Sequence, residues 1–402
     1  MGVKPAATLR STAEIRHRAN GLLARARAGD SPWFTVRDDA LPGAAAEVAD
    51  LTVQRFPDLA IPFHSRWRHF EAGGVHRTLD LDGADGPSRA RAMIDLAVVS
   101  VLLDAGAGPD WRYREERSGL EFSRSEGLGV ASWHAFTAGV FSSDPVRPLQ
   151  ADAAGLIDLD TERLAAAMQV GPGNPLVGFE GRTDVLRRLG SALADQPGVF
   201  GDPGRPGGIY DLLVTDPAAP TVAAHDILTV LLTSLSRIWL ADNVVDGEPM
   251  GDCWRHSAVP GPGATAGWMP FHKLSQWLTY SLLEPFDWSG VEVTGIDALT
   301  GLPEYRNGGL LLDTGVLALR ADSWSAAEWS PADELVVEWR ALTVALLDEL
   351  AVLVRARLGV DAEALPLACV LEGGTWAAGR VLAQRLRGGL PPLTVISDGT
   401  VF

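Results

Sequence analysis

The segment 299–309, Leu-Thr-Gly-Leu-Pro-Glu-Tyr-Arg-Asn-Gly-Gly, places an anion, a hydroxyl and a cation side by side in Glu304, Tyr305 and Arg306. The glycine and the proline before them predict a turn that restarts a helix, with Glu304 in the first turn. We expect its carboxylate to be stabilised there and to stay ionised. Such a group can stabilise the positive charge that develops on a sugar as a glycosidic bond breaks. The alternative is that Glu304 only caps the helix. Asp313, nine residues further on, is a second catalytic candidate.

A lysine close to a second predicted helix start offers an anion site. The segment 271–282, Phe-His-Lys-Leu-Ser-Gln-Trp-Leu-Thr-Tyr-Ser-Leu, carries apolar residues at helical spacing, and Lys273 falls in its opening turn. An ammonium group beside the free N–H groups of a helix start can bind phosphate. The alternative is a lysine that faces solvent.

The segment 64–74, His-Ser-Arg-Trp-Arg-His-Phe-Glu-Ala-Gly-Gly, alternates cations with aromatic rings. Arg66, Trp67 and His69 can close over a planar, hydrogen-bonding ligand, and the glycines allow the backbone to approach it. A surface loop anchored by its tryptophan is the alternative.

Two further polar clusters carry weaker signals. In the segment 251–256, Asp252 and His256 could bind a ligand or a metal, but an Asp–Arg pair that fixes a loop is the more frequent arrangement. The C-terminal tail ends in Val-Phe, which indicates that it docks, and Asp398 then becomes a hydrogen-bond acceptor in a pocket.

Composition and missing signatures exclude several classes of function. The chain has 34 Lys and Arg against 51 Asp and Glu, a net charge of −17, which argues against nucleic-acid or anionic membrane partners. It contains no phosphate-binding glycine loop, dinucleotide fingerprint, serine-hydrolase elbow or His-Glu-x-x-His pair. No apolar stretch reaches the roughly 18 residues of a membrane span, and the 2 cysteines lack zinc-site spacing. We expect a cytoplasmic protein with a small-molecule substrate and no metal or cofactor.

Helical patterns dominate the elements that must position these side chains. Helices are predicted at residues 11–28, 43–55, 87–105, 223–240, 271–283, 304–317, 331–358 and 365–387. Residues 111–114 and 120–123 predict a short β-ribbon, and no strand–helix alternation indicates a parallel sheet. We therefore predict a mainly α fold, a single interdigitated domain over residues 1–402 with one or two β-ribbons, and a division near residue 205 as the alternative.

Six long motifs extend to the last residue of the chain. They are the segments 65–74, 251–256, 271–276, 302–309, 371–376 and 397–402. Together they resemble the uracil-catabolism family that forms the fourth component of the URC pathway. In that pathway uracil is ribosylated, its ring is opened, and a ribosylurea-type intermediate remains to be split. The resemblance implies that this protein acts on that intermediate.

A more distant similarity concerns the mechanism. Phe271-His-Lys273 and Glu304-Tyr-Arg306 are similar to the Phe-x-Lys and Asp-Tyr-Arg motifs of the queuosine-nucleotide hydrolases, which are helical relatives of DNA glycosylases. The similarity implies a DNA-glycosylase-like fold, with a 5′-phosphate or ribose hydroxyls held by Lys273, Tyr305 and Arg306. Glu304 would take the place of the catalytic aspartate, with a side chain one methylene longer.

These inferences combine into an N-glycosidic hydrolase that converts ribosylurea, or its 5′-phosphate, and water into urea and the ribose product. Glu304 is expected to stabilise the oxocarbenium-like state, in a cavity shared with Lys273 and the Trp67 loop. Trp67 is expected to stack on the planar urea, and His69 or Arg66 to protonate it.

Two other classes of function stay open at this point. A metal-dependent amidohydrolase acting on the urea moiety would use His64, His69, His256 and Asp252. A non-catalytic protein would instead bind other pathway enzymes and channel intermediates between them.

Overall fold

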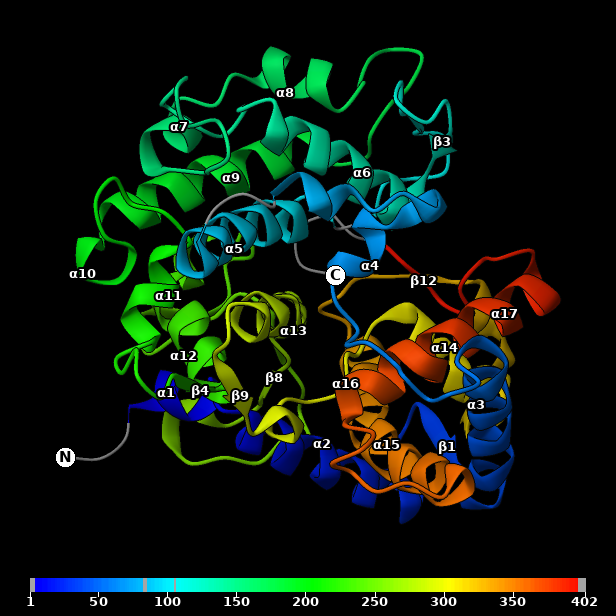
Figure 1. Cartoon of the computed structure of the whole chain (residues 1–402). Coiled ribbons are helices and arrows are strands. Elements are labelled where there is room, and N and C mark those ends of the chain that lie inside the picture. The colour runs from blue at the N-terminus through cyan, green and yellow to red at the C-terminus, as the bar shows by residue number, and fades with distance from the viewer. Residues whose placement is uncertain (1–3, 82–84, 105, 397–402) are drawn as a thin grey trace. The chain divides into compact units, whose positions relative to one another are not determined.

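The computed structural model describes residues 4–81, 85–104 and 106–396 (Figure 1). Helices hold 55% of the residues and strands 8%, which confirms the mainly α fold class. The chain divides into two compact units. The first takes its described residues from 1–64, 243–276 and 295–397, and the second from 65–242 and 277–294. The single interdigitated domain stays a prediction, and residue 205 lies inside the second unit. Among the described residues, no helix is long and apolar enough to cross a membrane.

Helix α15 is the longest element of the first unit. It covers Glu334–Leu358, is buried along much of its length, and ends at Gly359, whose positive φ of 70° is typical of helix ends. Helices α2 (Thr12–Arg27) and α3 (Leu41–Arg55) pack against it. The other helices of this unit are α1 (Pro5–Leu9), α14 (Tyr305–Asp313), α16 (Leu367–Val370), the π-helical turn η8 (Leu371–Thr375) and α17 (Trp376–Arg387).

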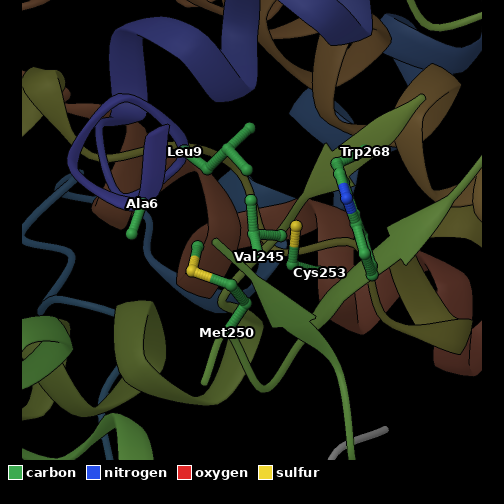
Figure 2. Close-up of a cluster of buried hydrophobic side chains, with 6 residues drawn as sticks. All are labelled: Ala6, Leu9, Val245, Met250, Cys253 and Trp268. Carbon is green, nitrogen blue, oxygen red and sulfur yellow. The ribbon is translucent and has the colours of Figure 1, made fainter. Parts of the chain in front are cut away.

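A hydrophobic cluster joins α1 to the segment that leads into helix α13 (Lys273–Trp288). Figure 2 shows its members, all buried: Ala6, Leu9, Val245, Met250, Cys253 and Trp268. Removing this apolar surface from water stabilises the contact by roughly 25 cal/mol per Å². Because the last strand of the segment ends at Pro270, the cluster helps to fix the position at which α13 begins.

Helices α5, α6 and α9 form much of the second unit. α5 (Gly86–Leu102) is buried without interruption over its last ten residues, and α6 (Arg124–Thr137) and α9 (Phe179–Ala194) both contact it. The remaining helices are α4 (Trp67–Phe70), α7 (Ala153–Ile157), α8 (Thr161–Ala167), α10 (Pro197–Phe200), α11 (Gly208–Leu213), α12 (Ala224–Ser234) and the part of α13 after Gln276.

The named strands of the described chain form two-stranded sheets. The predicted ribbon is confirmed, because β2 (Tyr113–Arg114) pairs antiparallel with β3 (Glu121–Phe122). The other antiparallel pairs are β1 (Phe34–Val36) with β10 (Leu317–Leu319), β5 (Val244–Val245) with β6 (Glu248–Pro249), and β7 (Cys253–Arg255) with β8 (Trp268–Pro270). The parallel pairs are β4 (Thr221–Ala223) with β9 (Glu292–Thr294) and β11 (Glu328–Trp329) with β12 (Thr394–Val395). The structure has more pairs than predicted because strands of two or three residues are too short to show an alternating pattern.

Candidate functional site

Glu304 caps the N-terminus of helix α14, one position before the first turn in which the sequence places it. Its carboxylate accepts hydrogen bonds from the backbone N–H of Arg306 to Oε2 (2.7 Å) and of Asn307 to Oε1 (2.6 Å). The side chain is half-buried. The helix start therefore holds both carboxylate oxygens in one orientation.

Burial raises the pKa of Glu304 above the ordinary value of 4.5. The N–H groups of Arg306 and Asn307, and the charges of Lys273 and His64, act in the opposite direction without cancelling that effect. The helix start therefore does not lower the pKa of this carboxylate as expected, because desolvation outweighs the dipole and the nearby cations. These electrostatic effects indicate that Lys273 and His64 lie in the neighbourhood of Glu304, in the first unit.

Lys273 is the first residue of α13, in agreement with the predicted helix start. Its backbone N–H donates to Oδ2 of Asp252 (2.9 Å), and the N–H groups of the two preceding residues donate to the Asp252 carbonyl. His272 has a positive φ of 50°, an uncommon and costly conformation for a residue with a side chain. Its Nε2 lies 3.0 Å from the Leu9 carbonyl oxygen. The helix start that presents Lys273 is therefore held by Asp252 and by α1.

Arg340 of α15 connects the Lys273 turn to the Glu304 turn. Its Nη1 and Nη2 each donate to the Asp252 carboxylate at 2.7 Å, and its Nε donates to the carbonyl of Pro303 (3.2 Å). One buried guanidinium thus holds the residue that caps α13 and the residue that precedes Glu304.

A second link joins the same two segments. The backbone N–H of Thr300 donates to Gln276 Oε1 (3.0 Å), and the Gln276 amide donates to the Thr300 hydroxyl. Both residues are fully buried. Because Gln276 lies in the first turn of α13, this exchange fixes the distance between the two helix starts.

His64 and Glu372 form a pair beside this cluster. This pairing was not predicted from the sequence. His64 Nδ1 lies 2.8 Å from Glu372 Oε2, and Arg55 Nη2 donates to Oε1 of the same carboxylate (3.2 Å). Glu372 belongs to the π-helical turn η8, a type of turn that is frequent at functional sites. The signals in the sequence are the motifs around these two residues, but 308 positions separate them and no local pattern pairs them.

Tyr305 and Arg306 follow Glu304 in the chain but differ in environment. Tyr305 is 40% exposed, whereas Arg306 is buried. The Arg306 guanidinium lies 4.7 Å from the Tyr305 ring centroid, and its Nη1 donates to the Gly389 carbonyl (3.3 Å). A Cβ on Gly379 would overlap the Arg306 carbonyl, so this glycine allows α17 to pack closely on α14. Tyr305 is the better placed of the two to contact a ligand.

Asp313 lies at the opposite end of α14 from Glu304. A rise of 1.5 Å per residue separates the two positions by about 13 Å along the helix. Asp313 pairs with Arg387 (2.6 Å) and is buried on that side. The structure therefore does not bring the second catalytic candidate to the first.

Two buried oxygen atoms of the first unit have no hydrogen-bond partner among the described residues. They are Oδ1 of Asn307, in the first turn of α14, and Oγ1 of Thr375, at the end of η8. An unsatisfied buried acceptor costs about 1–3 kcal/mol. A ligand that donates N–H or O–H groups can satisfy such atoms.

Trp67 belongs to the core of the second unit. Its side chain is 0% exposed, and its Nε1 donates to the Ser281 carbonyl (2.8 Å). The ring packs edge-on against Phe70 and Trp288, at centroid distances of 5.3 and 5.0 Å. This corrects the expectation that Trp67 stacks on a planar ligand, because protein atoms enclose the ring.

Arg66 and His69 also lie in the second unit. Arg66 is 0% exposed, donates to Ser100 Oγ (2.6 Å) and pairs with Asp104. His69 is half-buried, and its ring lies edge-on to Trp277 at 5.8 Å. Arg66 is thus committed to an internal ion pair. A cavity that these residues share with Glu304 stays a prediction.

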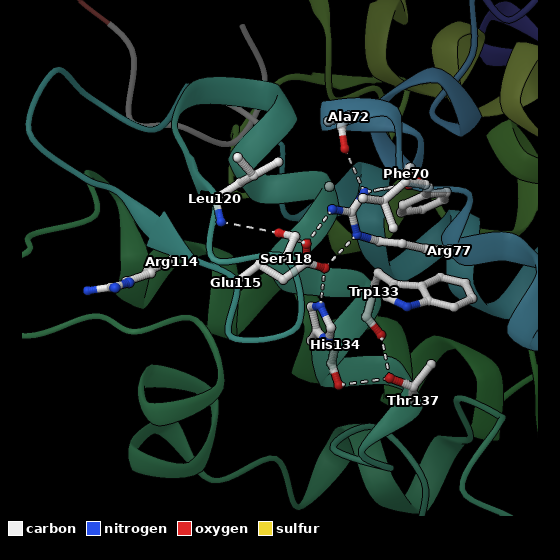
Figure 3. Close-up of polar contacts among 12 residues, drawn as sticks. Phe70, Ala72, Arg77, Arg114, Glu115, Ser118, Leu120, Trp133, His134 and Thr137 are labelled. Carbon is white, nitrogen blue, oxygen red and sulfur yellow. Dashed lines mark hydrogen bonds and ion pairs between the residues drawn. The ribbon is translucent and has the colours of Figure 1, made fainter.

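Arg77 holds the end of the short helix that carries these residues. Figure 3 shows its Nη1 donating to the carbonyls of Phe70 and Ala72, at 2.9 Å each. Its Nε and Nη2 donate to Glu115 (2.7 and 2.6 Å), which also contacts His134 Nε2 (2.7 Å). The bond from Arg77 is the main reason that the pKa of Glu115 falls to about 2.

A cavity of about 550 Å³ lies in the second unit and contains none of the predicted site residues. Its lining includes Arg91, Arg147, Phe200, Arg205 and Asp211. Asp398, the predicted acceptor in the tail, lies outside the described residues.

The side chains named for a metal site have other partners. The Asp252 carboxylate binds Arg340, Trp254 Nε1 (2.7 Å) and the α13 start; burial would raise the pKa of Asp252, but these contacts hold it below its usual value. His256 Nε2 lies 3.1 Å from Glu338. Among the described residues, no group of three or more His, Cys, Asp or Glu side chains could hold a metal ion.

The geometry thus defines a mainly helical protein. In one unit, the Glu304 carboxylate caps a helix, Lys273 begins a second helix, and Glu372 pairs with His64. Residues 8–402 match the family described as "Protein of unknown function (DUF1688)", and the chain belongs to this family. It is 39% identical over 415 residues to "Protein urg3" of Schizosaccharomyces pombe, covering 100% of both chains. It is also 39% identical over 378 residues to "Uracil catabolism protein 4" of Lachancea kluyveri, covering 85% of each. The resemblance to the uracil-catabolism family is confirmed.

Proposed function

We propose that this protein acts in uracil catabolism as an N-glycosidic hydrolase that splits ribosylurea, or its 5′-phosphate, into urea and the ribose product. The similarity to a uracil-catabolism protein over 85% of the chain supports the pathway. The observation that carries the reaction type is the Glu304 carboxylate, fixed by two backbone N–H groups and lying near Lys273.

The chemistry follows from the charge that develops when the bond breaks. As the C1′–N bond lengthens, its electron pair moves to the urea nitrogen and positive charge gathers on the ribose. A carboxylate that is already oriented stabilises this charge without having to reorganise. Water then adds hydroxide to C1′, and its proton balances the one taken up by the urea.

Lys273 and Tyr305 supply the contacts for the sugar. An ammonium group at a helix start attracts a 5′-phosphate or binds ribose hydroxyls. Tyr305 is 40% exposed, and its hydroxyl can bind a further ribose oxygen. The buried acceptors Asn307 Oδ1 and Thr375 Oγ1 suit the N–H and O–H groups of such a substrate.

The decisive experiment replaces Glu304 by glutamine. Glu304→Gln keeps the size and one oxygen but removes the negative charge, so urea release is expected to fall by at least 10²–10³. Free urea is measured with ribosylurea and with its 5′-phosphate in separate reactions. Circular dichroism and the melting temperature verify that the variant is folded.

Glu334→Gln is the matched control, because Glu334 also lies at a helix start and accepts a backbone N–H, from Ser257 (2.6 Å). We expect near-normal urea release from it. Normal turnover by Glu304→Gln would remove Glu304 from the mechanism. No urea from either substrate with the wild-type protein would contradict the hydrolase and favour a non-catalytic role.

A further inference from the structure

The His64–Glu372 pair is oriented as an acid–base group would be. The carboxylate is held on both sides, by Arg55 at Oε1 and by His64 at Oε2. Arg55 Nη1 also donates to the carbonyls of Glu372 and Gly373, so the guanidinium fixes the turn itself. His64 is 8% exposed, and its backbone N–H donates to the Ala368 carbonyl (3.0 Å). Neither member of the pair is a loosely held surface group.

The contact at Nδ1 determines which ring nitrogen of His64 can exchange a proton with a ligand. A carboxylate at 2.8 Å favours the arrangement in which Nδ1 carries a proton and donates it to Glu372. The pair therefore leaves Nε2 as the atom through which a proton is given or taken. The same arrangement orients the histidine of carboxylate–histidine catalytic groups generally.

His64 interacts electrostatically with Glu304. The charges of His64 and Lys273 both lower the pKa of Glu304, which burial raises. Glu372, which also binds Arg55, lies beside the imidazole, and Glu304 interacts with it electrostatically. Trp376 of α17 adds a ring at 6.1 Å, with Arg380 over that ring. A carboxylate and a proton donor in one cluster are the two groups that glycosidic cleavage uses.

We propose that His64 is the general acid that protonates the leaving urea nitrogen, and that Glu372 is the residue that positions it. This inference rests on the hydrolase function proposed above. The Nε2–H proton passes to the urea nitrogen as the C1′–N bond breaks and its electron pair stays with urea. The water that adds to C1′ returns a proton to the imidazole. One water is consumed and the histidine ends as it began.

Two substrates with different leaving groups test the assignment. Ribosylurea needs protonation of its leaving nitrogen, whereas 4-nitrophenyl riboside releases a stable anion that does not. His64→Asn is expected to lower urea release by 10²–10⁴, the range of general acid catalysis, and nitrophenol release by less than tenfold. Glu304→Gln is expected to lower both. Equal losses on the two substrates in His64→Asn would overturn the acid role while leaving the hydrolase proposal intact.

A pH profile gives a second readout that a structural role would not change. The basic limb of kcat/KM on ribosylurea reports loss of the acid's proton, and we expect it to disappear in His64→Asn. Glu372→Gln is expected to lower urea release more than nitrophenol release, because the imidazole loses the carboxylate that orients it. His17→Asn, at an exposed position of α2, is the control and keeps the wild-type profile. An unchanged limb in His64→Asn would contradict the proposal, whereas no urea from the wild-type protein would contradict the hydrolase itself.

Discussion

At the residue scale, the behaviour of Glu304 depends on two opposed environments. A helix N-terminus lowers the pKa of a carboxylate, and removal from water raises it. Here burial prevails over the N–H groups of Arg306 and Asn307 and over the charges of Lys273 and His64. The Glu304 side chain is therefore in its carboxylate form, the form that stabilises positive charge, over a narrower pH range than an ordinary glutamate.

This balance predicts the acidic limb of the pH profile. The reactive form is the carboxylate, so kcat/KM falls as pH decreases through the raised pKa of Glu304. We expect the limb above 4.5, the ordinary value for glutamate. Lys273→Met removes a charge that lowers this pKa, so the limb should move to still higher pH. Urea release measured between pH 4 and 8 checks both statements; a limb at or below 4.5, or a downward move in Lys273→Met, would contradict them.

At the element scale, the candidate site depends on the relative placement of the starts of α13 and α14. Arg340 binds Asp252, which caps α13, and the Pro303 carbonyl, which precedes the α14 cap. The Gln276–Thr300 exchange forms a second link between the same segments. Removing either link should disturb activity before it unfolds the protein.

Arg340→Met tests this link. It leaves the Asp252 carboxylate buried without its cation, so the free energy of unfolding should fall by about 3–5 kcal/mol. The double variant Asp252→Asn/Arg340→Met removes the isolated charge and should regain part of that stability. It should not regain kcat/KM, because the bond to Pro303 is still missing. Denaturant unfolding and urea release measure the two effects, and recovery of both together would show that Arg340 acts on stability alone.

At the scale of the whole molecule, the net charge of −17 conceals a set of buried cations. Arg18, Arg66, Arg77, Arg182 and Arg340 are among the largest fully buried side chains. Each of them binds a carboxylate or a backbone carbonyl inside its own unit. The net charge therefore gives no sign of these buried pairs, such as Arg66–Asp104 and Arg77–Glu115.

The Arg77–Glu115 pair predicts how stability changes with acid. The pKa of Glu115 is about 2 in the folded chain, against an ordinary value of 4.5, so its contribution is complete above the ordinary value and is lost as pH falls toward 2. Glu115→Gln should lower the free energy of unfolding by about 3–5 kcal/mol at pH 7, and by less at pH 3. Denaturant unfolding at several pH values measures this. The double variant Arg77→Met/Glu115→Gln, which leaves no lone charge, should be closer to wild type, and a pH-independent loss in Glu115→Gln would refute the argument.

The prediction of the fold succeeded where signals were local. Ser11 accepts the Glu14 N–H and begins α2 as a cap, and Lys273 begins α13, because helix starts depend on a few neighbouring residues. Strands of two or three residues carry no such signal. The pairing of β1 with β10 depends on segments nearly three hundred positions apart.

The site was predicted less completely than the fold. Glu304 and Lys273 come together, whereas Trp67 and Arg66 prove to be core residues and Asp313 lies at the far end of its helix. The sequence of a loop-like motif does not show whether an aromatic or cationic side chain faces a ligand or the protein interior. Only its neighbours distinguish the two.

By itself, the sequence determined the helical class, the helix starts that carry Glu304 and Lys273, and the motifs that relate the chain to its family. These features follow from local backbone preferences and from residue identity. The tertiary structure decided how ionisable groups are paired, namely His64 with Glu372 and Arg340 with Asp252. It also decided the burial of Glu304, which raises the pKa of that side chain. The physical reason is that electrostatic interaction and desolvation depend on distance in space and on exclusion of water, and both are set by segments that lie far apart in the chain.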